Sequence, residues 1–356
     1  MSNHVTFCPY TIGEDAYDAI PAVCEKLGGR LLLIGGKTAM EKAKPAFLKA
    51  IQDSDLTLVA DRWHGGECTF ARIAELSEEC GALDVDLIVG MGGGKAIDTA
   101  KGVANKLGLP VVTLPTIAST CAGTTALSVV YHEDHTHDRT IFFDGPPAHC
   151  FIHTGILAQA PDRYLRAGMG DTIAKHFECH FSARGDTLAH SSALGREISN
   201  LCYTPLLACG RQALTDCQQG SDTPALREAV LANVVTTGLV SLLVEERYNG
   251  AVAHSVCYGL SILPEVEKNF LHGDIVAYGV LVQLMLDHDT KQAATLRDFL
   301  KSLGSPVTLA DFGVPNDDAL LSPVIEKALS GSDMEYLPYP VTAKMLRDAI
   351  TATETL

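Results

Sequence analysis

The stretch Asp86–Tyr131, DLIVGMGGGKAIDTAKGVANKLGLPVVTLPTIASTCAGTTALSVVY, decides the fold that we expect for this chain. Within it, a short apolar run leads into the glycine-rich turn Gly90–Gly94, and apolar residues at helical spacing follow over Lys95–Leu107. The next apolar run, Val111–Leu114, has the length of a second buried strand. This order predicts two parallel strands joined by a helix, with free backbone N–H groups at the helix N-terminus where a phosphate or pyrophosphate can bind. The alternative is a plain strand–helix turn whose glycines serve only close packing.

The glycine-rich turn matches neither of two common phosphate-binding fingerprints. Lys95 stands where the last glycine of G-x-G-x-x-G belongs, and Ala96 follows it where a Walker A loop needs Ser or Thr. A second near-match, Gly35-Gly36-Lys37-Thr38, fails because Leu31 occupies the position of that loop's first glycine. The phosphate assignment therefore needs support from other parts of the chain.

Composition narrows the classes of function. The chain has 356 residues, of which 47% are hydrophobic and 20% charged, as in a folded enzyme of one large or two medium domains. Its net charge of -16 argues against nucleic acid and anionic membranes as partners. The N-terminus has no signal-peptide pattern, and no apolar run reaches the length of a membrane span. The eleven cysteines contain no C-x-x-C pair, so we expect reduced thiols in a cytoplasmic protein.

The pattern along the chain changes near Pro161. Before it, short apolar runs alternate with amphipathic stretches, which predicts a mainly parallel sheet covered by helices on both faces. After it, only long amphipathic stretches follow, so we expect an α/β domain over 1–160 and an all-helical domain over 161–356. The expected strands are Val5–Phe7, Arg30–Ile34, Leu56–Ala60, Asp86–Val89, Val111–Leu114 and Cys150–Thr154. The expected helices are Asp15–Leu27, Thr38–Ile51, Cys68–Cys80, Lys95–Leu107, Pro161–Phe181, Thr187–Leu214, Pro224–Glu246, Ala251–Leu263, Gly273–Leu286 and Gln292–Leu303.

The segment Leu127–Phe143 has the pattern of a β-hairpin with a polar tip. Three histidines at the tip, His132, His135 and His137, are close enough in sequence to suggest a metal clip. Their acidic neighbours favour a solvated hairpin tip instead.

Three motifs in this order, GMGGGKAIDTAK (Gly90–Lys101), PTIAST (Pro115–Thr120) and ALSVVY (Ala126–Tyr131), resemble the iron-containing alcohol dehydrogenase superfamily, and most of all its glycerol dehydrogenase branch. The resemblance continues through the helical half and covers most of the chain. It implies a Rossmann-like α/β N-terminal domain with a mainly parallel sheet and an all-helical C-terminal domain, which is the dehydroquinate synthase-like architecture. It also implies a metal-dependent dehydrogenase that uses NAD(H) or NADP(H) on a small-molecule substrate. We expect this enzyme to be a homo-oligomer.

Three residues of the helical half, Asp171, His254 and His272, are chemically suited to hold a divalent metal. Their spacing alone says little, and a helix-capping aspartate with two core histidines is the alternative. The superfamily's metal motifs G-x-x-D-x-x-A, A-H-x-x-x-x-G and H-G are matched by Gly168–Ala174, Ala253–Gly259 and His272-Gly273. The resemblance therefore implies that the three residues are catalytic ligands of zinc or iron, which would polarise the substrate oxygen.

The resemblance also implies a set of cofactor-binding residues in the N-terminal half. Gly36 stands where the family usually has an aspartate that binds the adenosine ribose and repels a 2′-phosphate, and Lys37 adds a positive charge beside it. We therefore expect a moderate preference for NADPH; the alternative is a tight glycine turn with a lysine in solvent. The full predicted set is Gly36, Lys37, Gly92, Gly93, Gly94, Lys95, Asp98, Thr116, Ser119, Thr125, Leu127 and Tyr131.

Departures from the glycerol dehydrogenase pattern concern the substrate. Cys121 stands where that branch has an aspartate that contacts the polyol, and Cys257 replaces the second histidine of its A-H-x-x-H segment. The segments Leu165–Thr172 and Lys268–Gly273 instead resemble a related branch that reduces 2-oxo acids to hydroxycarboxylates. Without a carboxylate at position 121, no charge there repels a substrate carboxylate. We rank 2-oxo acid reduction first and a glycerol or diol dehydrogenase second, far ahead of a dehydroquinate synthase-type lyase or a non-catalytic binding protein.

Overall fold

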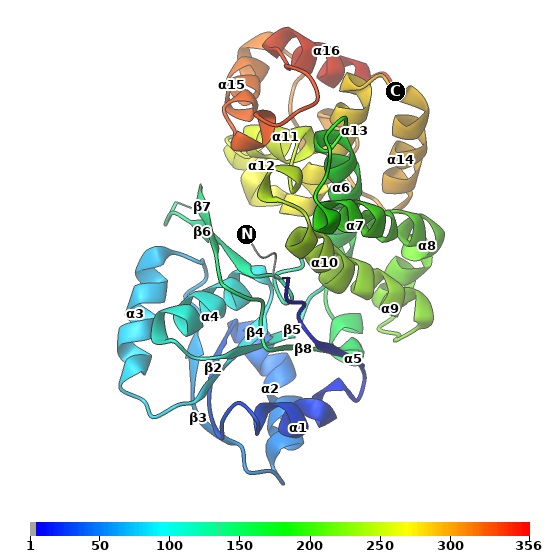
Figure 1. Ribbon diagram of the computed structural model, residues 1–356. Coiled ribbons are helices and arrows are strands. Elements are labelled where there is room, and N and C mark those ends of the chain that lie inside the picture. Colours follow the sequence, from blue (N-terminus) through cyan, green and yellow to red (C-terminus); the bar gives the residue numbers. More distant parts are fainter. Residues whose placement is uncertain (1–4, 135) are drawn as a thin grey trace. The chain divides into compact units, whose positions relative to one another are not determined.

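The computed structural model describes residues 5–134 and 136–356, and the chain divides into two compact units (Figure 1). The first unit comprises Met1–Pro161 and Asp216–Arg227, and the second comprises Asp162–Thr215 and Glu228–Leu356. The sequence predicts a single boundary at residue 161, whereas the structure groups Asp216–Arg227 with the first unit.

Side-chain hydrogen bonds hold the segment Asp216–Arg227 in the first unit. Thr154 donates its hydroxyl hydrogen to the carboxylate of Asp222, and the thiol sulfur of Cys217 lies 3.5 Å from the carbonyl oxygen of Ala160. These contacts join residues that are distant in sequence, so local patterns do not reveal them.

A six-stranded sheet forms the centre of the first unit. Its strands are β1 (Tyr10–Gly13), β2 (Arg30–Gly35), β3 (Thr57–Trp63), β4 (Leu87–Gly92), β5 (Val111–Pro115) and β8 (His149–His153). Their order is β1-β8-β5-β4-β2-β3, and every neighbouring pair is parallel. The register aligns Gly35 with Met91 and Gly92 with Pro115, so β2, β4 and β5 end at one edge of the sheet.

Helices cover both faces of this sheet, which confirms the predicted α/β fold class (Figure 1). They are α1 (Ile20–Cys24), α2 (Lys37–Ile51), α3 (Phe70–Gly81), α4 (Gly94–Leu107) and α5 (Thr154–Ala158), with a 3-10 turn η1 (Ala16–Ala19). Leu31 and Leu33 of β2 belong to the core with α1 and α2, and Leu32 and Ile34 belong to the core with α3 and α4. This division follows because successive side chains of a strand point to opposite faces.

The predicted hairpin is present as β6 (Leu127–Tyr131) and β7 (His137–Phe142), which pair antiparallel in a separate two-stranded sheet. At its tip, His132 is exposed and its Nδ1 lies 4.0 Å from the carboxylate of Asp138. His135 lies outside the described residues. Among those that are described, no metal-ligating group forms at the tip.

Every regular element of the second unit is a helix or helical turn, as predicted. The helices beyond residue 161 are α6 (Asp162–Ser182), α7 (His190–Ile198), α8 (Thr204–Gln218), α9 (Pro224–Leu231), α10 (Thr237–Leu243), α11 (Val252–Leu260), α12 (Pro264–Asn269), α13 (His272–Leu286), α14 (Thr290–Ser302), α15 (Asp318–Leu329) and α16 (Ala343–Thr353). Short turns are the π-helical η3 (Ala232–Thr236) and the 3-10 turns η2 (Ser199–Cys202), η4 (Glu246–Tyr248), η5 (Ala310–Phe312) and η6 (Ser332–Met334).

Some predicted elements are wrong in position or length. Val5–Phe7 is not a strand, and the edge strand β1 begins after Pro9 instead. The predicted helix Thr187–Leu214 is interrupted between α7 and α8, where Pro205 lacks the N–H group that a continuous helix requires. The predicted helix Pro224–Glu246 contains the π-helical turn and ends at Leu243. The sequence analysis does not predict the helices α5, α12, α15 and α16.

One helical segment has the length and mean hydropathy at which a helix could cross a membrane, although it includes the charged residues Arg227 and Glu228. It covers Pro224–Leu243 with a mean hydropathy of 1.4, and 61% of the tested window is buried inside the protein. This burial is typical of a core helix in a soluble protein.

Glycines allow the helices α6, α11 and α13 to pack so closely that their backbone atoms are in contact. A Cβ atom on Gly273 would lie 1.9 Å from the carbonyl oxygen of Ala167, and one on Gly170 would lie 2.4 Å from the carbonyl oxygen of Gly273. A Cβ atom on Gly279 would lie 2.3 Å from the carbonyl oxygen of Ala253. No side chain fits at these helix crossings, because the opposing atoms belong to rigid backbone.

Replacement of Gly273 by alanine should therefore destabilise the protein. Overpacking of this kind costs about 1–3 kcal/mol or more, and the urea midpoint of the helical unit, followed by circular dichroism, should fall. The control is Gly145→Ala, because an added Cβ at Gly145 meets nothing within 4 Å. If both variants unfold at the parent's midpoint, the crossing does not need glycine.

Candidate functional site

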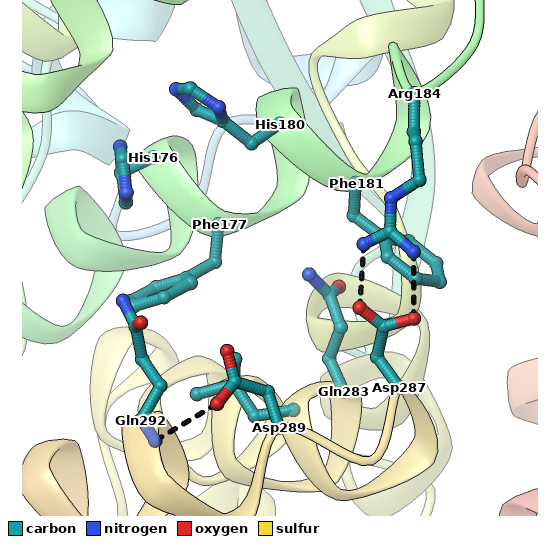
Figure 2. A pocket seen from close by; sticks show the side chains of 10 residues that line it. His176, Phe177, His180, Phe181, Arg184, Gln283, Asp287, Asp289 and Gln292 are labelled. Carbon is teal, nitrogen blue, oxygen red and sulfur yellow. Dashed lines mark hydrogen bonds and ion pairs between the residues drawn. The ribbon is translucent and has the colours of Figure 1, made fainter.

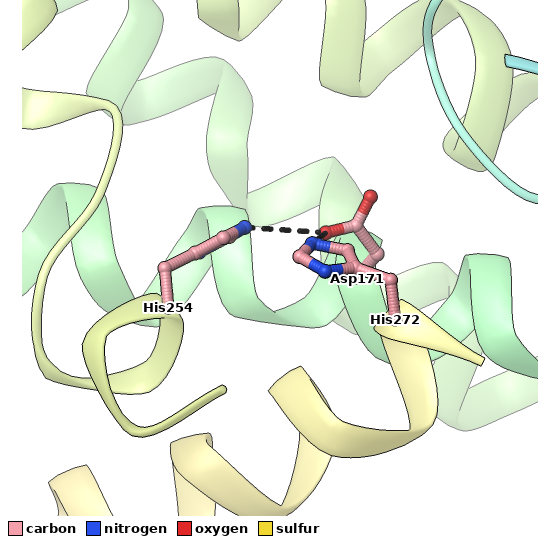
Figure 3. A group of neighbouring side chains, drawn as sticks. All are labelled: Asp171, His254 and His272. Atoms are coloured by element: carbon pink, nitrogen blue, oxygen red, sulfur yellow. Dashed lines mark ion pairs between the residues drawn. The ribbon is translucent and has the colours of Figure 1, made fainter. Parts of the chain in front are cut away.

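Asp171, His254 and His272 come together in the second unit although they are far apart in sequence (Figure 3). Asp171 lies on α6, His254 lies on α11, and His272 is the first residue of α13. Asp171 Oδ1 is 3.5 Å from His254 Nε2 and 3.9 Å from His272 Nε2, and one ligand atom from each residue lies within 4.8 Å of the others. A carboxylate oxygen and two imidazole nitrogens at this spacing suit a divalent ion such as zinc or iron.

The three side chains differ in exposure, and this gives the group an open side. The side chains of Asp171 and His254 are each 15% exposed, whereas that of His272 is 42% exposed. Three protein ligands with one open side are the arrangement of catalytic metal sites, which keep a coordination position for substrate.

A buried glutamate that sequence reasoning missed, Glu178, fixes the orientation of His254. Its Oε2 lies 2.5 Å from His254 Nδ1, and its Oε1 accepts hydrogen bonds of 2.8 Å from the backbone N–H groups of Ala251 and His254. Because a carboxylate only accepts, Nδ1 keeps its proton, and Nε2, which faces Asp171, is the nitrogen through which His254 can bind a metal. Glu178 follows Asp171 by about two helical turns, and this spacing on one helix face is the signal that could have identified it.

The two carboxylates make the site attractive to positive charge. Burial lowers the pKa of His254, but the charge of Glu178 and the hydrogen bonds to both carboxylates outweigh it and raise that pKa to about 10. Burial likewise raises the pKa of Asp171, but His254 and His272 outweigh it and the net pKa is lowered. Asp171 is therefore ionised at neutral pH, as a metal ligand must be.

Cys257, which replaces a histidine of the glycerol dehydrogenase pattern, contacts the Nδ1 atom of His272. Its sulfur lies 3.4 Å from His272 Nδ1, on the opposite side of the ring from the nitrogen that faces Asp171. Burial raises the pKa of the Cys257 thiol well above its usual range, so it stays protonated. Cys257 therefore supports the orientation of His272.

The predicted cofactor turn forms at the N-terminus of α4 in the first unit. A Cβ atom on Gly93 would lie 2.6 Å from the side chain of Ile117, and one on Gly94 would lie 3.1 Å from Thr120 Oγ1. The backbone N–H of Thr116 donates to the carbonyl of Gly92 at 3.0 Å. The glycines thus let the loop after β5 pack onto the turn, and no side chain caps the N-terminus of α4.

Lys95 lies on the first turn of α4, and its side chain contacts two residues from outside that helix. Its Nζ lies 2.5 Å from Oε2 of the buried Glu67 and 5.4 Å from the centroid of the Tyr131 ring. Because Glu67 balances the lysine charge, the backbone N–H groups of the turn are the main groups available to an anion there.

A buried lysine that sequence reasoning missed, Lys101, organises the loop that precedes the hairpin. Its Nζ lies 2.8 Å from Asp98 Oδ1, donates to the carbonyl of Ala122 at 2.9 Å, and is bonded to Thr125 and to the carbonyl of Leu127. Burial raises the pKa of Asp98, although Lys101 opposes this effect. Asp98, Thr125 and Leu127 each contact Lys101, and Asp98 Oδ2 also accepts a 3.1 Å hydrogen bond from the backbone N–H of Val129. Their role in cofactor binding stays a prediction.

Gly36 lies next to the glycine-rich turn, and Lys37 lies over an aromatic ring. The backbone N–H of Gly36 donates to the carbonyl of Met91 at 3.2 Å. Lys37 Nζ lies 4.1 Å from the centroid of Trp63, at the end of β3. A Cβ atom on Gly36 would meet only ordinary contacts, 3.6 Å from Ala39 and 4.0 Å from His64. Packing therefore does not require glycine at this position.

The remaining predicted residues lie in the loop after β5. Cys121 and Ser119 are partly exposed there, and the carbonyl of Cys121 accepts a 2.9 Å hydrogen bond from the backbone N–H of Thr124. Cys121 is thus in the same loop as the groups that pack on the glycine turn.

Comparisons with known proteins identify the family and several relatives of this chain. A family model described as iron-containing alcohol dehydrogenase matches residues 9–150. The chain is 33% identical over 354 residues to a glycerol dehydrogenase of Citrobacter freundii, covering 98% of this chain and 95% of the relative. It is 37% identical over 292 residues to hydroxycarboxylate dehydrogenase A of Escherichia coli strain K12, covering 81% of this chain and 80% of the relative. A solved structure of a probable glycerol dehydrogenase from Sinorhizobium meliloti 1021 matches with a TM-score of 0.87 and 29% identity, covering 99% of this chain and 98% of that one.

Replacement of Glu178 by glutamine should weaken metal binding roughly 10- to 100-fold, the usual effect of losing such a partner. The amide oxygen must stay where two backbone N–H groups donate, so the amide NH₂ group would face His254 Nδ1 and move the imidazole proton to Nε2. Zinc affinity measured by competition with a chromophoric chelator tests this effect.

The matched control is Glu326→Gln, an exposed site on α15 of the same unit. It should bind zinc like the parent. Unchanged affinity in a folded Glu178→Gln protein would show that Glu178 does not orient a metal ligand.

Proposed function

The chain belongs to the iron-containing alcohol dehydrogenase family and is an NAD(P)-dependent oxidoreductase of CH–OH groups. From this premise we propose that it interconverts a small 2-oxo acid and its hydroxycarboxylate. We further propose NADP(H) as the preferred cofactor and one divalent ion, zinc or iron, held by Asp171, His254 and His272. The convergence of these three side chains from three helices is the observation that carries the proposal. When bound, such an ion supplies Lewis-acid polarisation of the substrate oxygen.

The chain's own residues prepare this site electrostatically. Asp171 is the single anionic ligand beside two imidazoles, so the ligand set does not cancel the charge of a divalent ion. Glu178 keeps the His254 proton on Nδ1, and Cys257 contacts Nδ1 of His272. Each imidazole therefore presents its Nε2 atom, and neither needs to rotate when a substrate arrives.

The cofactor pyrophosphate is proposed to bind at the N-terminus of α4. Gly93 is the N-cap residue of this helix and has no capping side chain, and Glu67 balances the charge of Lys95. Backbone N–H groups and the helix dipole would then supply the attraction for the phosphates.

The proposed preference for NADPH rests on Gly36 and Lys37. Gly36 offers no carboxylate to the adenosine ribose, although a side chain would fit there. Trp63 is paired with Gly35 in the parallel register of β2 and β3, and the Lys37 ammonium lies over its ring. This places the positive charge close in space to position 36. A 2′-phosphate near position 36 would therefore be attracted by the Lys37 ammonium and would not be repelled by a carboxylate of residue 36.

The protein is also proposed to act as a homo-oligomer in the cytoplasm. The eleven cysteines, all within the described part of the chain, form no disulfide with one another, and most of them are buried, as is usual in a reducing compartment. Leu194 and Leu201 are exposed on the surface around α7, where a second copy could cover them.

A second candidate function is the oxidation of glycerol or another diol, because the chain also resembles named glycerol dehydrogenases. The residue that separates the two candidates is Cys121, a neutral thiol in place of the polyol-binding aspartate of that branch.

Gly36→Asp should shift the cofactor preference toward NADH, because the new carboxylate repels a 2′-phosphate. Lys37→Ala should raise the KM for NADPH roughly fivefold, since one exposed charge contact is worth about 1 kcal/mol. Steady-state kinetics with both cofactors measure these shifts. Lys49→Ala, an exposed change near the other end of α2, is the control. Equal losses for NADH and NADPH in Lys37→Ala would refute the role of Lys37.

Cys121→Asp should lower kcat/KM for 2-oxo acids and raise it for glycerol, because a carboxylate repels a carboxylate and accepts hydrogen bonds from hydroxyl groups. The control is Cys121→Asn, which has nearly the same shape without the charge. The measurement is a panel of 2-oxo acids, aldehydes, glycerol and diols with both cofactors. Faster glycerol oxidation than oxo-acid reduction by the unmodified enzyme would reverse our ranking of the two functions.

A further inference from the structure

His64 is a buried histidine directly after β3, at the edge of the sheet where β2 and β4 also end. Its backbone N–H donates to the carbonyl of Gly35 at 3.0 Å, which fixes it beside the start of α2. The residue is 8% exposed, and its Nδ1 atom is buried without a hydrogen-bond partner. Its Nε2 atom faces Gly36, since a Cβ atom on that glycine would lie 4.0 Å from it.

The backbone around His64 is fixed from two sides. Gly65 and Gly66 follow with φ angles of 108° and 101°, which favour glycine and turn the chain away from the strand. Arg72 of α3 donates from Nε to the carbonyl of His64 at 3.3 Å and from Nη2 to the carbonyl of Trp63 at 2.7 Å. These contacts, together with the bond to Gly35, limit the directions that the imidazole can take.

The missing partner of Nδ1 determines which ring nitrogen carries the proton. Burial lowers the pKa of His64 to about 4, so the ring is neutral at pH 7 and has one N–H group. A buried N–H without an acceptor is rarer in proteins than a buried lone pair without a donor. We therefore assign the proton to Nε2, and His64 then presents an N–H donor toward position 36.

Backbone donors lie beside this imidazole. Gly36 is the N-cap residue of α2 and no side chain caps that helix, so its first N–H groups have no partner within the helix. This end of α2 adjoins the glycine-rich turn, because a Cβ atom on Gly92 would lie 3.6 Å from the backbone nitrogen of Gly36. Gly36 is partly exposed and has room for added atoms. An anion beside Gly36 would therefore meet both a helix N-terminus and the His64 donor.

His180 has the other imidazole nitrogen that is buried without a partner among the described residues. It lines a hollow in the second unit whose charged groups are already bonded within the protein (Figure 2). Arg184 donates to both carboxylate oxygens of Asp287, and Asp289 caps α14. The helix end beside His64 differs from this hollow because its N–H donors have no such partners.

We propose that His64 is a specificity-determining residue for the dinucleotide, and that its Nε2–H donates a hydrogen bond to the 2′-phosphate of NADPH. This inference rests on the proposed cofactor site, since a dinucleotide whose pyrophosphate lies at the N-terminus of α4 extends its adenosine ribose past the end of the neighbouring strand β2. His64 supplies a directional donor from inside the protein, and Lys37 supplies a charge from the surface. NADH has a hydroxyl at that position and gains less, because hydrogen bonds to charged groups are the stronger ones.

Binding of two cofactor fragments to the intact enzyme, without substrate, tests this role. The probes are 2′,5′-ADP, which carries the 2′-phosphate, and AMP, which lacks it, and isothermal titration calorimetry gives both Kd values. His64→Phe keeps a ring of similar size without the donor, so it should weaken 2′,5′-ADP roughly tenfold and leave AMP unchanged. His64→Gln, whose amide NH₂ group can replace Nε2–H, should restore most of the affinity.

The matched control is His149→Phe, the same substitution at the start of β8, which is the opposite end of the parallel strands. It should bind both fragments like the parent. Equal losses for the two fragments in His64→Phe would show a structural role only and would overturn the proposal, as would no loss for either.

The same titrations separate this inference from the proposed function. If the parent binds neither fragment, the proposed cofactor site is wrong and the inference fails with it. If Lys37→Ala loses affinity for 2′,5′-ADP and His64→Phe does not, the preference for NADPH stands and the role of His64 is refuted. The substrate takes no part in these measurements, so an error in the proposed 2-oxo acid chemistry would appear in turnover assays and leave both Kd values unchanged.

Discussion

The close approach of α6, α11 and α13 is the constraint on which the candidate site depends. At Gly273 and Gly279 the backbones are so near that a methyl group would overlap a carbonyl oxygen. Each crossing lies beside a candidate ligand, since Gly170 precedes Asp171, Ala253 precedes His254, and Gly273 follows His272. The short side chains of the metal group can meet only because these helices pack at backbone distance.

Each unit contains a charged side chain that is buried inside the protein, and both are stabilised in the same way. Glu178 is fully buried and is matched by two backbone N–H groups and an imidazole, while Lys101 is buried among backbone carbonyls and one carboxylate. A buried charge without such partners would be strongly destabilising. Once fully bonded, it fixes its surroundings: Glu178 fixes one candidate ligand, and Lys101 fixes the loop between the glycine turn and the hairpin.

The sequence predicts those features of the fold that depend on the spacing of neighbouring apolar residues and on short motifs. The strand, glycine turn and helix around Gly90–Gly94 appear as expected, because alternating and helical spacing are properties of neighbouring residues. The grouping of Asp171, His254 and His272 came from resemblance to a family, since no spacing joins residues so far apart. The sequence analysis missed Glu178 and Lys101, because the role of a single charged residue in an apolar helix cannot be inferred until its tertiary contacts are known. The same reason explains the contact of Lys95 with Glu67, which local sequence does not show.

The most direct test of this account is an anomalous diffraction measurement at the zinc edge on crystals grown from the zinc-loaded, active enzyme. The account predicts an ion bounded by Asp171 Oδ1, His254 Nε2 and His272 Nε2, with Glu178 on the far side of the His254 ring. An active crystal with no anomalous peak among these three atoms would contradict it.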